Sequence, residues 1–300
     1  MALKASIDIG TNSTRLLIVD DRAGRINVIE GHERITRLGD DLSPLGELAP
    51  ASMQRVLTAL QEYRRVIDAH GIDDVRVMAT SATRDAPNRD SFLHLILATT
   101  GWRCRVLSGA EEARLSFLGA ISDLQHARDV LVCDIGGGST EFIFAHDRTM
   151  QSLDIGSSRL TKQFLLSDPP TKDKIDALIE FTQQQLQSSF GKKSALDIVA
   201  VGGTAVTLAL MDAETPLHDA GTAHHHLLTR VRLGRMIDTL SRARIAERAA
   251  IVGLHPRRAD VILAGALILS VILDFFACES TLISVRDLLY GIFFEERLRN

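Results

Sequence analysis

The chain has 300 residues, of which 45% are hydrophobic and 24% charged, and its formal net charge is −4 at pH 7. This is an ordinary soluble composition, so it excludes a disordered chain and a disulfide scaffold. The three cysteines follow no CxxC or zinc-binding spacing, which favours buried thiols and a cytoplasmic protein. No basic segment followed by a long apolar run opens the sequence, so we expect no signal peptide.

The first part of the chain predicts a three-strand meander followed by alternating helices and strands. Residues 6–10, 15–20 and 25–36 have the pattern of strands, and residues 50–71 have the spacing of an amphipathic helix. The elements expected next are a strand at 75–80, a helix at 89–101, a strand at 104–108 and a helix at 109–124.

The same order restarts at "VLVCDIG". The expected elements are strands at 130–136, 141–147 and 149–156, helices at 158–166 and 171–190, a strand at 197–202, and then mostly helices, with a strand at 280–285. The repetition predicts two α/β domains related by duplication, which join near residues 120–130. The apolar run Val261–Leu273 has only 13 residues, too few to span a hydrocarbon core of ~30 Å, so it predicts a buried helix and no membrane association.

Three turns of small residues are candidate phosphate-binding sites, because backbone N–H groups can converge there on an anion without interference from Cβ atoms. They are Gly10, Thr11, Asn12, Ser13 and Thr14; Gly136, Gly137, Gly138, Ser139 and Thr140; and Gly202, Gly203 and Thr204. The third also opens a predicted helix, whose dipole would reinforce anion binding. Each turn alone fits a hairpin equally well, and none matches the P-loop or GxGxxG pattern, but the three together favour phosphate.

The repeated phrase "DIG" places Asp8 and Asp134 two residues before the first glycine of their turns. An acid at the end of a strand can hold Mg²⁺ beside phosphate oxygens, directly or through water. The alternative is an aspartate that only stabilises the turn. The metal role is favoured because both copies carry the acid.

Two neighbouring glutamates occur in "SGAEEARL". Ser108 and Glu111 fit the S-x-x-E capping box, so Glu111 has a sufficient structural role. Glu112 is not needed for capping and is a candidate to orient or deprotonate an attacking water, although a solvated first-turn acid is the alternative. Arg84, among small hydroxyl residues, is a candidate phosphate clamp or the partner of Asp85 in an exposed ion pair.

Other charged segments are less specific. Arg257 and Arg258 follow a proline at the start of the buried helix and are candidates to meet a polyanion. The run His224–His226 invites a metal interpretation, but adjacent side chains on a strand or helix do not share a face, so a three-ligand site is not expected. Aromatic residues are too sparse for base-stacking platforms, so nucleic acid is not an expected partner.

In this order the motifs resemble the exopolyphosphatase/guanosine pentaphosphate phosphohydrolase (Ppx/GppA) family of the actin/hexokinase/heat-shock-ATPase superfamily. The matching stretches span nearly the whole chain: "IDIGTNSTRLLI", "ATSATRDAPN", "VLSGAEEARLSFLGA", "VCDIGGGSTEF", "LDIGSSRLTKQFL", "AVGGTAVTLA" and "GLHPRRADVILAGALIL". The resemblance implies an α/β fold of two duplicated ribonuclease-H-like domains with an interdomain cleft. It implies a first domain at 1–124, joined by a C-terminal helix at about 286–300, a second domain at 125–285, and a homodimer.

The resemblance also implies roles for residues. It makes Glu112 the general base, with Asp134 and Arg84 as further catalytic residues. It places Asp134 and Asp8 at a Mg²⁺ site, and the three turns and Arg258 on phosphate. Leu289 stands where the family tends to have an arginine, so any role of that arginine is lost or moved. The sequence shows no counterpart of the additional C-terminal helical domain that extends the polyanion channel of longer members, so the resemblance does not carry over their preference for long chains.

The function predicted from the resemblance is an exopolyphosphatase acting on inorganic polyphosphate, with short chains as possible substrates. A (p)ppGpp or nucleotide phosphohydrolase is the alternative within the same fold. A sensor that binds a phosphorylated ligand without hydrolysing it is the alternative of another class, and the retained Glu112, Asp134 and Arg84 argue against it.

Overall fold

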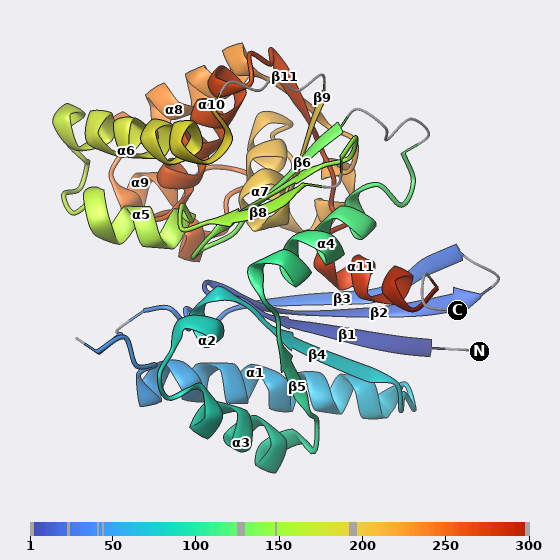
Figure 1. Cartoon of the computed structure of the whole chain (residues 1–300). Helices are drawn as coiled ribbons and strands as arrows, with labels where there is room; N and C mark the ends of the chain where they lie inside the picture. Colours follow the sequence, from blue (N-terminus) through green and yellow to red (C-terminus); the bar gives the residue numbers. More distant parts are fainter. Residues whose placement is uncertain are drawn as a thin grey trace. The chain divides into compact units, whose positions relative to one another are not determined.

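The computed structural model describes residues 3–22, 25–40, 42–43, 45–124, 130–147, 149–191 and 197–297. The predicted domain junction at 124/125 adjoins residues 125–129, which lie outside the described residues, as do the last three residues of the predicted C-terminal helix. The chain divides into two compact units (Figure 1). Unit 1 consists of Met1–Gly119 and Leu288–Asn300, and unit 2 of Ala120–Asp287.

Unit 1 is built on a five-stranded sheet in the order β3-β2-β1-β4-β5. Its strands are β1 (Leu3–Ile9), β2 (Ser13–Arg22), β3 (Arg25–Ile35), β4 (Val75–Ala79) and β5 (Cys104–Val106). Its helices are α1 (Pro50–Ala69), α2 (Ser81–Asp85), α3 (Arg89–Thr100), α4 (Gly109–Ala120) and α11 (Leu288–Arg297). The first three strands form an antiparallel meander, and β4 and β5 extend the sheet in parallel with β1.

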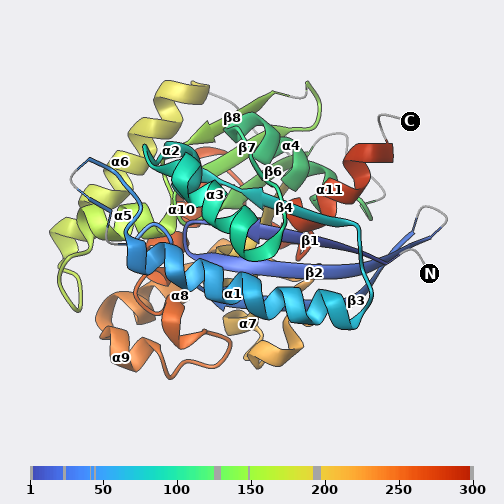
Figure 2. The same ribbon diagram turned by 90° about the horizontal axis from the view of Figure 1, so that it is seen from below.

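Alternate residues of this sheet face two separate layers, as the period of two along a strand requires. Ile7 and Ile18 belong to the core shared with α1 and α3, whereas Leu17 and Val19 pack with α11 on the other side. Figures 1 and 2 show α1 and α3 together on one face of the sheet. The Ser6 hydroxyl donates to the Leu289 carbonyl of α11 at 2.8 Å, so the last helix is fixed to the first strand of the unit.

Unit 2 contains a six-stranded sheet in the order β10-β11-β9-β6-β7-β8. Its strands are β6 (Val130–Ile135), β7 (Thr140–Phe144), β8 (Met150–Leu153), β9 (Asp197–Val201), β10 (Leu227–Thr229) and β11 (Ser280–Ile283). Its helices are α5 (Ser157–Phe164), α6 (Lys172–Phe190), α7 (Gly202–Asp212), α8 (Arg230–Arg242), α9 (Ile245–Arg248) and α10 (Ile262–Phe275), with 3₁₀ turns η1 (Leu217–Ala223) and η2 (Pro256–Arg258). Apart from β10, the order β8-β7-β6-β9-β11 repeats that of unit 1, so the predicted duplication is confirmed.

The apolar run near the C-terminus forms the buried helix that the sequence predicts. Helix α10 is buried along nearly all of its length and packs against α5, α6 and α8. Within the part of the chain that the structure describes, no helix has the length and apolarity needed to cross a membrane.

Three local features differ from the sequence-based expectation. Helix α2 was not expected, because five residues are too few to show a helical period. Strand β10 has only three residues and was likewise missed. Helix α4 ends at Ala120 and not at residue 124, and beyond its end Ser122 and Asp123 contact Arg286 and His224.

Two glycines in helix interiors give a matched test of this packing. A Cβ atom on Gly291 of α11 would overlap the Leu115 carbonyl oxygen, whereas a Cβ atom on Gly234 of α8 would meet nothing within 4 Å. We expect Gly291→Ala to destabilise the protein by about 1–3 kcal/mol, because the two helices must move apart. Gly234→Ala should stabilise it by about 0.5–1 kcal/mol through helix propensity. Denaturant unfolding measures both, and equal effects would contradict the close α4–α11 packing.

Candidate functional site

The two "DIG" phrases form the same turn in the two units. The Gly10 N–H donates to the Ser13 carbonyl at 2.9 Å, and the Gly136 N–H donates to the Ser139 carbonyl at 3.0 Å. In both units this turn joins a buried strand to an antiparallel neighbour. The duplication therefore extends to the hydrogen bond that closes each candidate phosphate loop.

In unit 2 the carbonyl groups of the glycine loop are occupied by the start of α5. The N–H groups of Ser157 and Ser158 donate to the carbonyls of Gly136 and Gly137, both at 2.9 Å. Arg159 Nε donates to the Gly138 carbonyl at 2.7 Å. Because these carbonyls point toward α5, the opposite edge of the loop is the one that can present N–H groups to an anion.

In unit 1 a different segment binds the corresponding carbonyls. The N–H groups of Arg37 and Gly39 donate to the carbonyls of Asn12 and Thr11 at 2.8 and 2.9 Å. A Cβ atom on Gly39 would overlap the Thr11 side chain, so a glycine permits this close approach. Thr14 is fully buried, and its hydroxyl lies 2.9 Å from that of Thr36.

The two copies differ in charge at the position opposite the aspartate. Asp8 pairs across β1 and β2 with Arg15, and Asp134 pairs across β6 and β7 with Glu141. Directly opposed residues of antiparallel strands point to the same face. In unit 1 the result is an ion pair, with Arg15 Nη2 2.6 Å from Asp8 Oδ2.

In unit 2 the same register brings two acids to one face of the sheet. Asp134 is 6% exposed and Glu141 is 1% exposed. Glu141 Oε1 accepts a hydrogen bond from the Ser152 hydroxyl at 2.7 Å. Two buried carboxylates on one face repel each other unless a cation or proton lies with them, and oxygen ligands of this kind suit Mg²⁺.

The third candidate loop lies against Asp134. Gly202 opens α7 with φ +84°, and a Cβ atom there would overlap Asp134 Oδ1. A Cβ atom on Gly203 would overlap the guanidinium of Arg258, which is 7% exposed. The structure thus brings Asp134, the N-terminus of α7 and Arg258 together within unit 2, and the glycines make that approach possible.

The candidate base Glu112 is paired with Arg84 in unit 1. Arg84 Nη1 lies 2.9 Å from Glu112 Oε2 and also donates to the Leu107 carbonyl at 3.1 Å. The Glu112 side chain is 8% exposed and that of Arg84 is 21% exposed. Arg84 also lies 3.6 Å from Asp85, but its shorter contact is with the buried glutamate.

Glu111 has the structural role that its spacing predicts. The Ser108 N–H donates to Glu111 Oε2 at 2.9 Å, and the Glu111 N–H donates to the Ser108 hydroxyl at 3.2 Å, so the capping box is present. The hydrogen bond from Arg105, with a smaller contribution from Ser108, lowers the pKa of Glu111 to about 2. Neighbouring glutamates therefore have separate environments, one in a cap and one beside Arg84.

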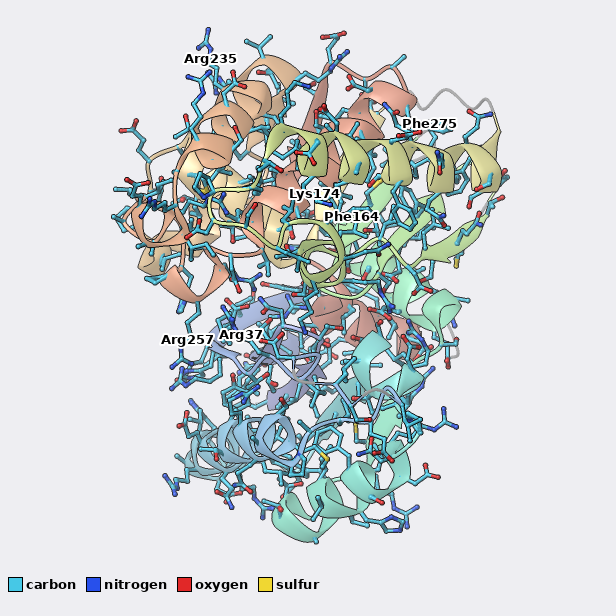
Figure 3. The ribbon with its side chains drawn as sticks, turned by 90° about the vertical axis from the view of Figure 1, so that its left-hand side faces the viewer. Arg37, Phe164, Lys174, Arg235, Arg257 and Phe275 are labelled. Carbon is cyan, nitrogen blue, oxygen red and sulfur yellow. The ribbon has the colours of Figure 1, made fainter. Side chains whose placement is uncertain are left out.

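Sequence reasoning missed three polar residues at these loops, namely Arg15, Glu141 and Arg159. Arg15 and Glu141 each lie seven residues after the aspartate of their "DIG" phrase, and this equal spacing was the sequence signal that could have identified them. In the strand register, each lies directly opposite its aspartate. Of the two arginines in η2, which precedes α10, Arg258 is buried against Gly203 while Arg257 is exposed (Figure 3). Leu289 lies in the apolar layer between α11 and the sheet.

The backbone of His224–His226 does not have regular strand or helix geometry. The expectation that adjacent side chains point to different faces is therefore wrong for His224 and His225. His225 has φ +63°, and its ring stacks on that of His224 with centroids 4.0 Å apart. His226 instead lies 2.7 Å from Asp212. The three histidines therefore do not share one ligand site, although two of them share Asp123.

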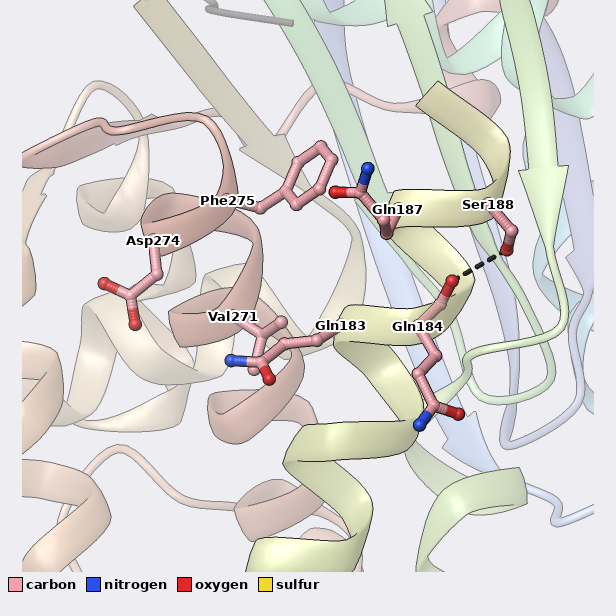
Figure 4. Close-up of a pocket in the computed structure, with 7 residues that line it drawn as sticks. All are labelled: Gln183, Gln184, Gln187, Ser188, Val271, Asp274 and Phe275. Atoms are coloured by element: carbon pink, nitrogen blue, oxygen red, sulfur yellow. Dashed lines mark hydrogen bonds between the residues drawn. The ribbon is translucent and has the colours of Figure 1, made fainter. Parts of the chain in front are cut away.

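A surface hollow of about 590 Å³ lies between α6 and α10 (Figure 4). Its lining consists of Gln183, Gln184, Gln187, Ser188, Val271, Asp274 and Phe275. None of the candidate phosphate or metal residues lines it, and its surface is mostly apolar. This hollow is therefore not part of the candidate site.

The fold and the loops together define a duplicated α/β protein of the actin-like class, with small-residue turns suited to phosphate. The chain belongs to the Ppx/GppA phosphatase family, whose model matches residues 17–300.

Similar proteins agree with this assignment. Exopolyphosphatase 2 of Mycobacterium tuberculosis is 36% identical over 279 residues, which is 88% of each chain. The crystal structure of the Aquifex aeolicus Ppx/GppA family member superposes with a TM-score of 0.84 at 32% identity, covering 99% of this chain and 98% of that one. An exopolyphosphatase structure from Cytophaga hutchinsonii has a TM-score of 0.90 at 26% identity, covering 98% and 97%.

The contact between Gly202 and Asp134 can be tested by substitution. Gly202→Ala should destabilise the protein by about 1–3 kcal/mol, because φ +84° strains alanine and its Cβ overlaps the carboxylate. Asp134→Ala removes the overlap but not the strain, so the double variant should recover part of the loss. A double-mutant cycle from denaturant unfolding measures this coupling, and strict additivity would show that the two residues are not in contact.

Proposed function

We propose that the chain is an exopolyphosphatase, which hydrolyses the terminal phosphoanhydride bond of inorganic polyphosphate and releases orthophosphate. The observation that carries the proposal is the buried Glu112 held by Arg84 at 2.9 Å. A carboxylate fixed in this way is suited to act as a general base toward water. The proposal is supported by family membership and by the name of the mycobacterial relative.

The chemical step is an in-line attack by water on the terminal phosphorus. Glu112 orients the water and accepts one of its protons as the new P–O bond forms. The bond from the terminal phosphorus to the bridging oxygen breaks, and the shortened chain leaves with the electron pair on that oxygen. Arg84 holds the Glu112 carboxylate through Nη1, and in this proposal its positive charge stabilises the charge that develops on the phosphoryl oxygens.

The small-residue loops bind phosphate groups in this proposal. In unit 2 the Gly136–Ser139 loop supplies backbone N–H groups, since its carbonyls are occupied by the start of α5. The α7 N-terminus adds a favourable dipole at Gly203, and Arg258 adds a full positive charge beside it. In unit 1 the loop from Gly10 to Thr14 has the same closing hydrogen bond and takes the same role.

A divalent cation, proposed to be Mg²⁺, fits the acid pair of unit 2. Asp134 and Glu141 supply buried carboxylate oxygens on one face of the sheet, and such oxygens are the ligands that Mg²⁺ prefers. When bound there, Mg²⁺ would neutralise negative charge on the phosphate oxygens. Asp8 is the second predicted metal residue, but its carboxylate is engaged by Arg15 at 2.6 Å, so we propose that it contributes less.

The base assignment predicts different outcomes for the two neighbouring glutamates. Glu112→Gln should reduce phosphate release by about 10²–10⁴-fold, the range for loss of a general base, while substrate binding is largely kept. Glu111→Gln is the matched control and should retain activity with a modest loss of stability. Phosphate release from short polyphosphate, long polyphosphate and pppGpp, with binding measured separately, checks both variants.

The substrate panel also separates the alternatives. Release from pppGpp alone would favour the guanosine pentaphosphate phosphohydrolase. Release from none of the three substrates by the wild type would favour the phosphate-ligand sensor. Hydrolysis at the wild-type rate by Glu112→Gln would show that Glu112 is not the base.

Asp8 lies opposite a positive residue and Asp134 opposite a negative one. This difference predicts that substituting Asp134 affects the Mg²⁺ requirement more than substituting Asp8. Asp134→Asn should raise the Mg²⁺ concentration for half-maximal activity by at least about tenfold. Even residues that only hydrogen-bond to a metal ligand change metal affinity by about that factor when they are substituted. Asp8→Asn should raise it less, because Arg15 already neutralises that carboxylate. Activity titrated with Mg²⁺ measures the shift, and a larger effect at Asp8 would reverse the assignment.

A further inference from the structure

A second group of potential metal ligands lies in unit 2 and differs in chemistry from the acid pair, because it contains two imidazoles. The group consists of Asp123, His224 and His225, whose ligand atoms all lie within 4.8 Å of one another. His224 Nε2 is 2.7 Å and His225 Nε2 is 3.6 Å from Asp123 Oδ2. Both imidazoles therefore point at one carboxylate.

The backbone at His225 produces this convergence. A residue in an ordinary strand would turn the two rings to opposite faces. His225 instead adopts φ +63°, a conformation uncommon for residues other than glycine, and its ring lies on that of His224 with an interplanar angle of 26°. Such local strain persists only when the surrounding structure supports it, and it is found preferentially at ligand sites.

The three side chains are suited to receive a metal ion from solvent. The side chain of His225 is 46% exposed, and those of Asp123 and His224 are 22% and 20% exposed. Burial, opposed by the hydrogen bond to Asp123, lowers the pKa of His224 below its ordinary value.

We propose that Asp123, His224 and His225 form a binding site for a divalent transition metal, with Zn²⁺ as the representative ion. Two imidazole nitrogens and one carboxylate oxygen match the ligand preferences of Zn²⁺, Co²⁺ and Ni²⁺ and not those of Mg²⁺. Three protein ligands leave a coordination position for water. The site is independent of the proposed hydrolytic function, which uses other residues.

Two contacts oppose binding and limit its strength. The Val285 N–H donates weakly to His224 Nδ1 at 3.4 Å, and this contact is lost when the metal takes Nε2 and the ring proton moves to Nδ1. Arg286 Nη1 lies 3.4 Å from Asp123 Oδ2 and donates to the Ser122 hydroxyl at 3.1 Å. A guanidinium so close to a metal ligand repels the cation, so its removal should tighten the site.

The proposed metal site lies close in sequence to the two points where the chain passes between the units. The chain passes from unit 1 to unit 2 after Gly119 and returns after Asp287. Asp123 follows the first crossing closely in sequence, and Arg286 directly precedes the second. A metal ion on Asp123 and the two histidines would therefore join the segment after the first crossing to the loop before β10.

Another imidazole–carboxylate group serves as an internal comparison. In unit 1 the Glu30 carboxylate contacts His32 Nε2 at 2.6 Å and His70 Nε2 at 2.8 Å, but through its two separate oxygens. Within the described residues, Asp123, His224 and His225 are the only three His, Cys, Asp or Glu side chains whose ligand atoms all lie within 4.8 Å of one another. Zinc binding at Glu30 is therefore not expected.

The test uses the whole chain, freed of metal, and titrates Zn²⁺ against a chromogenic chelator. Wild type should bind one equivalent of Zn²⁺. The His225→Gly variant should bind Zn²⁺ at least about tenfold more weakly. Glycine suits φ +63°, so this variant removes the ligand without unfavourable backbone geometry. His226→Asn, which alters the neighbour that pairs with Asp212, should bind as wild type does, and Arg286→Gln should bind more tightly.

Stability and spectroscopy give independent readouts. Zn²⁺ should raise the melting temperature of wild type and not that of His225→Gly, and Co²⁺ should give a visible absorption band in wild type that His225→Gly lacks. No binding by wild type, equal binding by wild type and His225→Gly, or equal weakening by His226→Asn would each overturn the proposal. Weaker binding by Arg286→Gln would also contradict the placement of the ion on Asp123.

Discussion

The candidate site depends on one local constraint, the turn that closes each strand pair by a hydrogen bond from the first glycine to the serine three residues later. The closure appears at Gly10–Ser13 and again at Gly136–Ser139. It sets the register of the following strand, so the residue seven positions after each aspartate lies directly opposite it. The turn thus fixes both the shape of the candidate phosphate loop and the residue that lies opposite the aspartate.

The residue opposite the aspartate has a different charge in each unit. We infer from this difference that the two units have different roles in the proposed site. Arg15 neutralises Asp8 in unit 1, while Glu141 adds a second acid beside Asp134 in unit 2. We therefore propose that the cation binds in unit 2, where the two acids share one face of the sheet. Unit 1 instead carries Glu112, whose position is held by a charge-assisted bond from Arg84. The two units share one scaffold, and the residues at the matched register positions, Arg15 and Glu141, differ in charge.

Much of the fold was readable from the sequence because its signals are local. Strand–turn–strand patterns and the amphipathic α1 follow from periodicity, and the buried α10 follows from the length of its apolar run. The S-x-x-E spacing correctly separated the capping Glu111 from Glu112. Glu141 and Arg15 were missed, because their importance arises from cross-strand register. The approach of Gly203 to Arg258 and the stacking of His224 on His225 depend on tertiary packing and on one positive φ, which no residue pattern encodes.

The central claim is that the acid pair of unit 2, and not the Asp8–Arg15 pair, binds the divalent cation. The most direct measurement is an anomalous-difference map from crystals grown with Mn²⁺ and a non-hydrolysable phosphate chain. We predict a peak beside the carboxylates of Asp134 and Glu141, with the Arg15–Asp8 ion pair intact. A peak beside Asp8 with Arg15 displaced, and none near Asp134, would contradict the account.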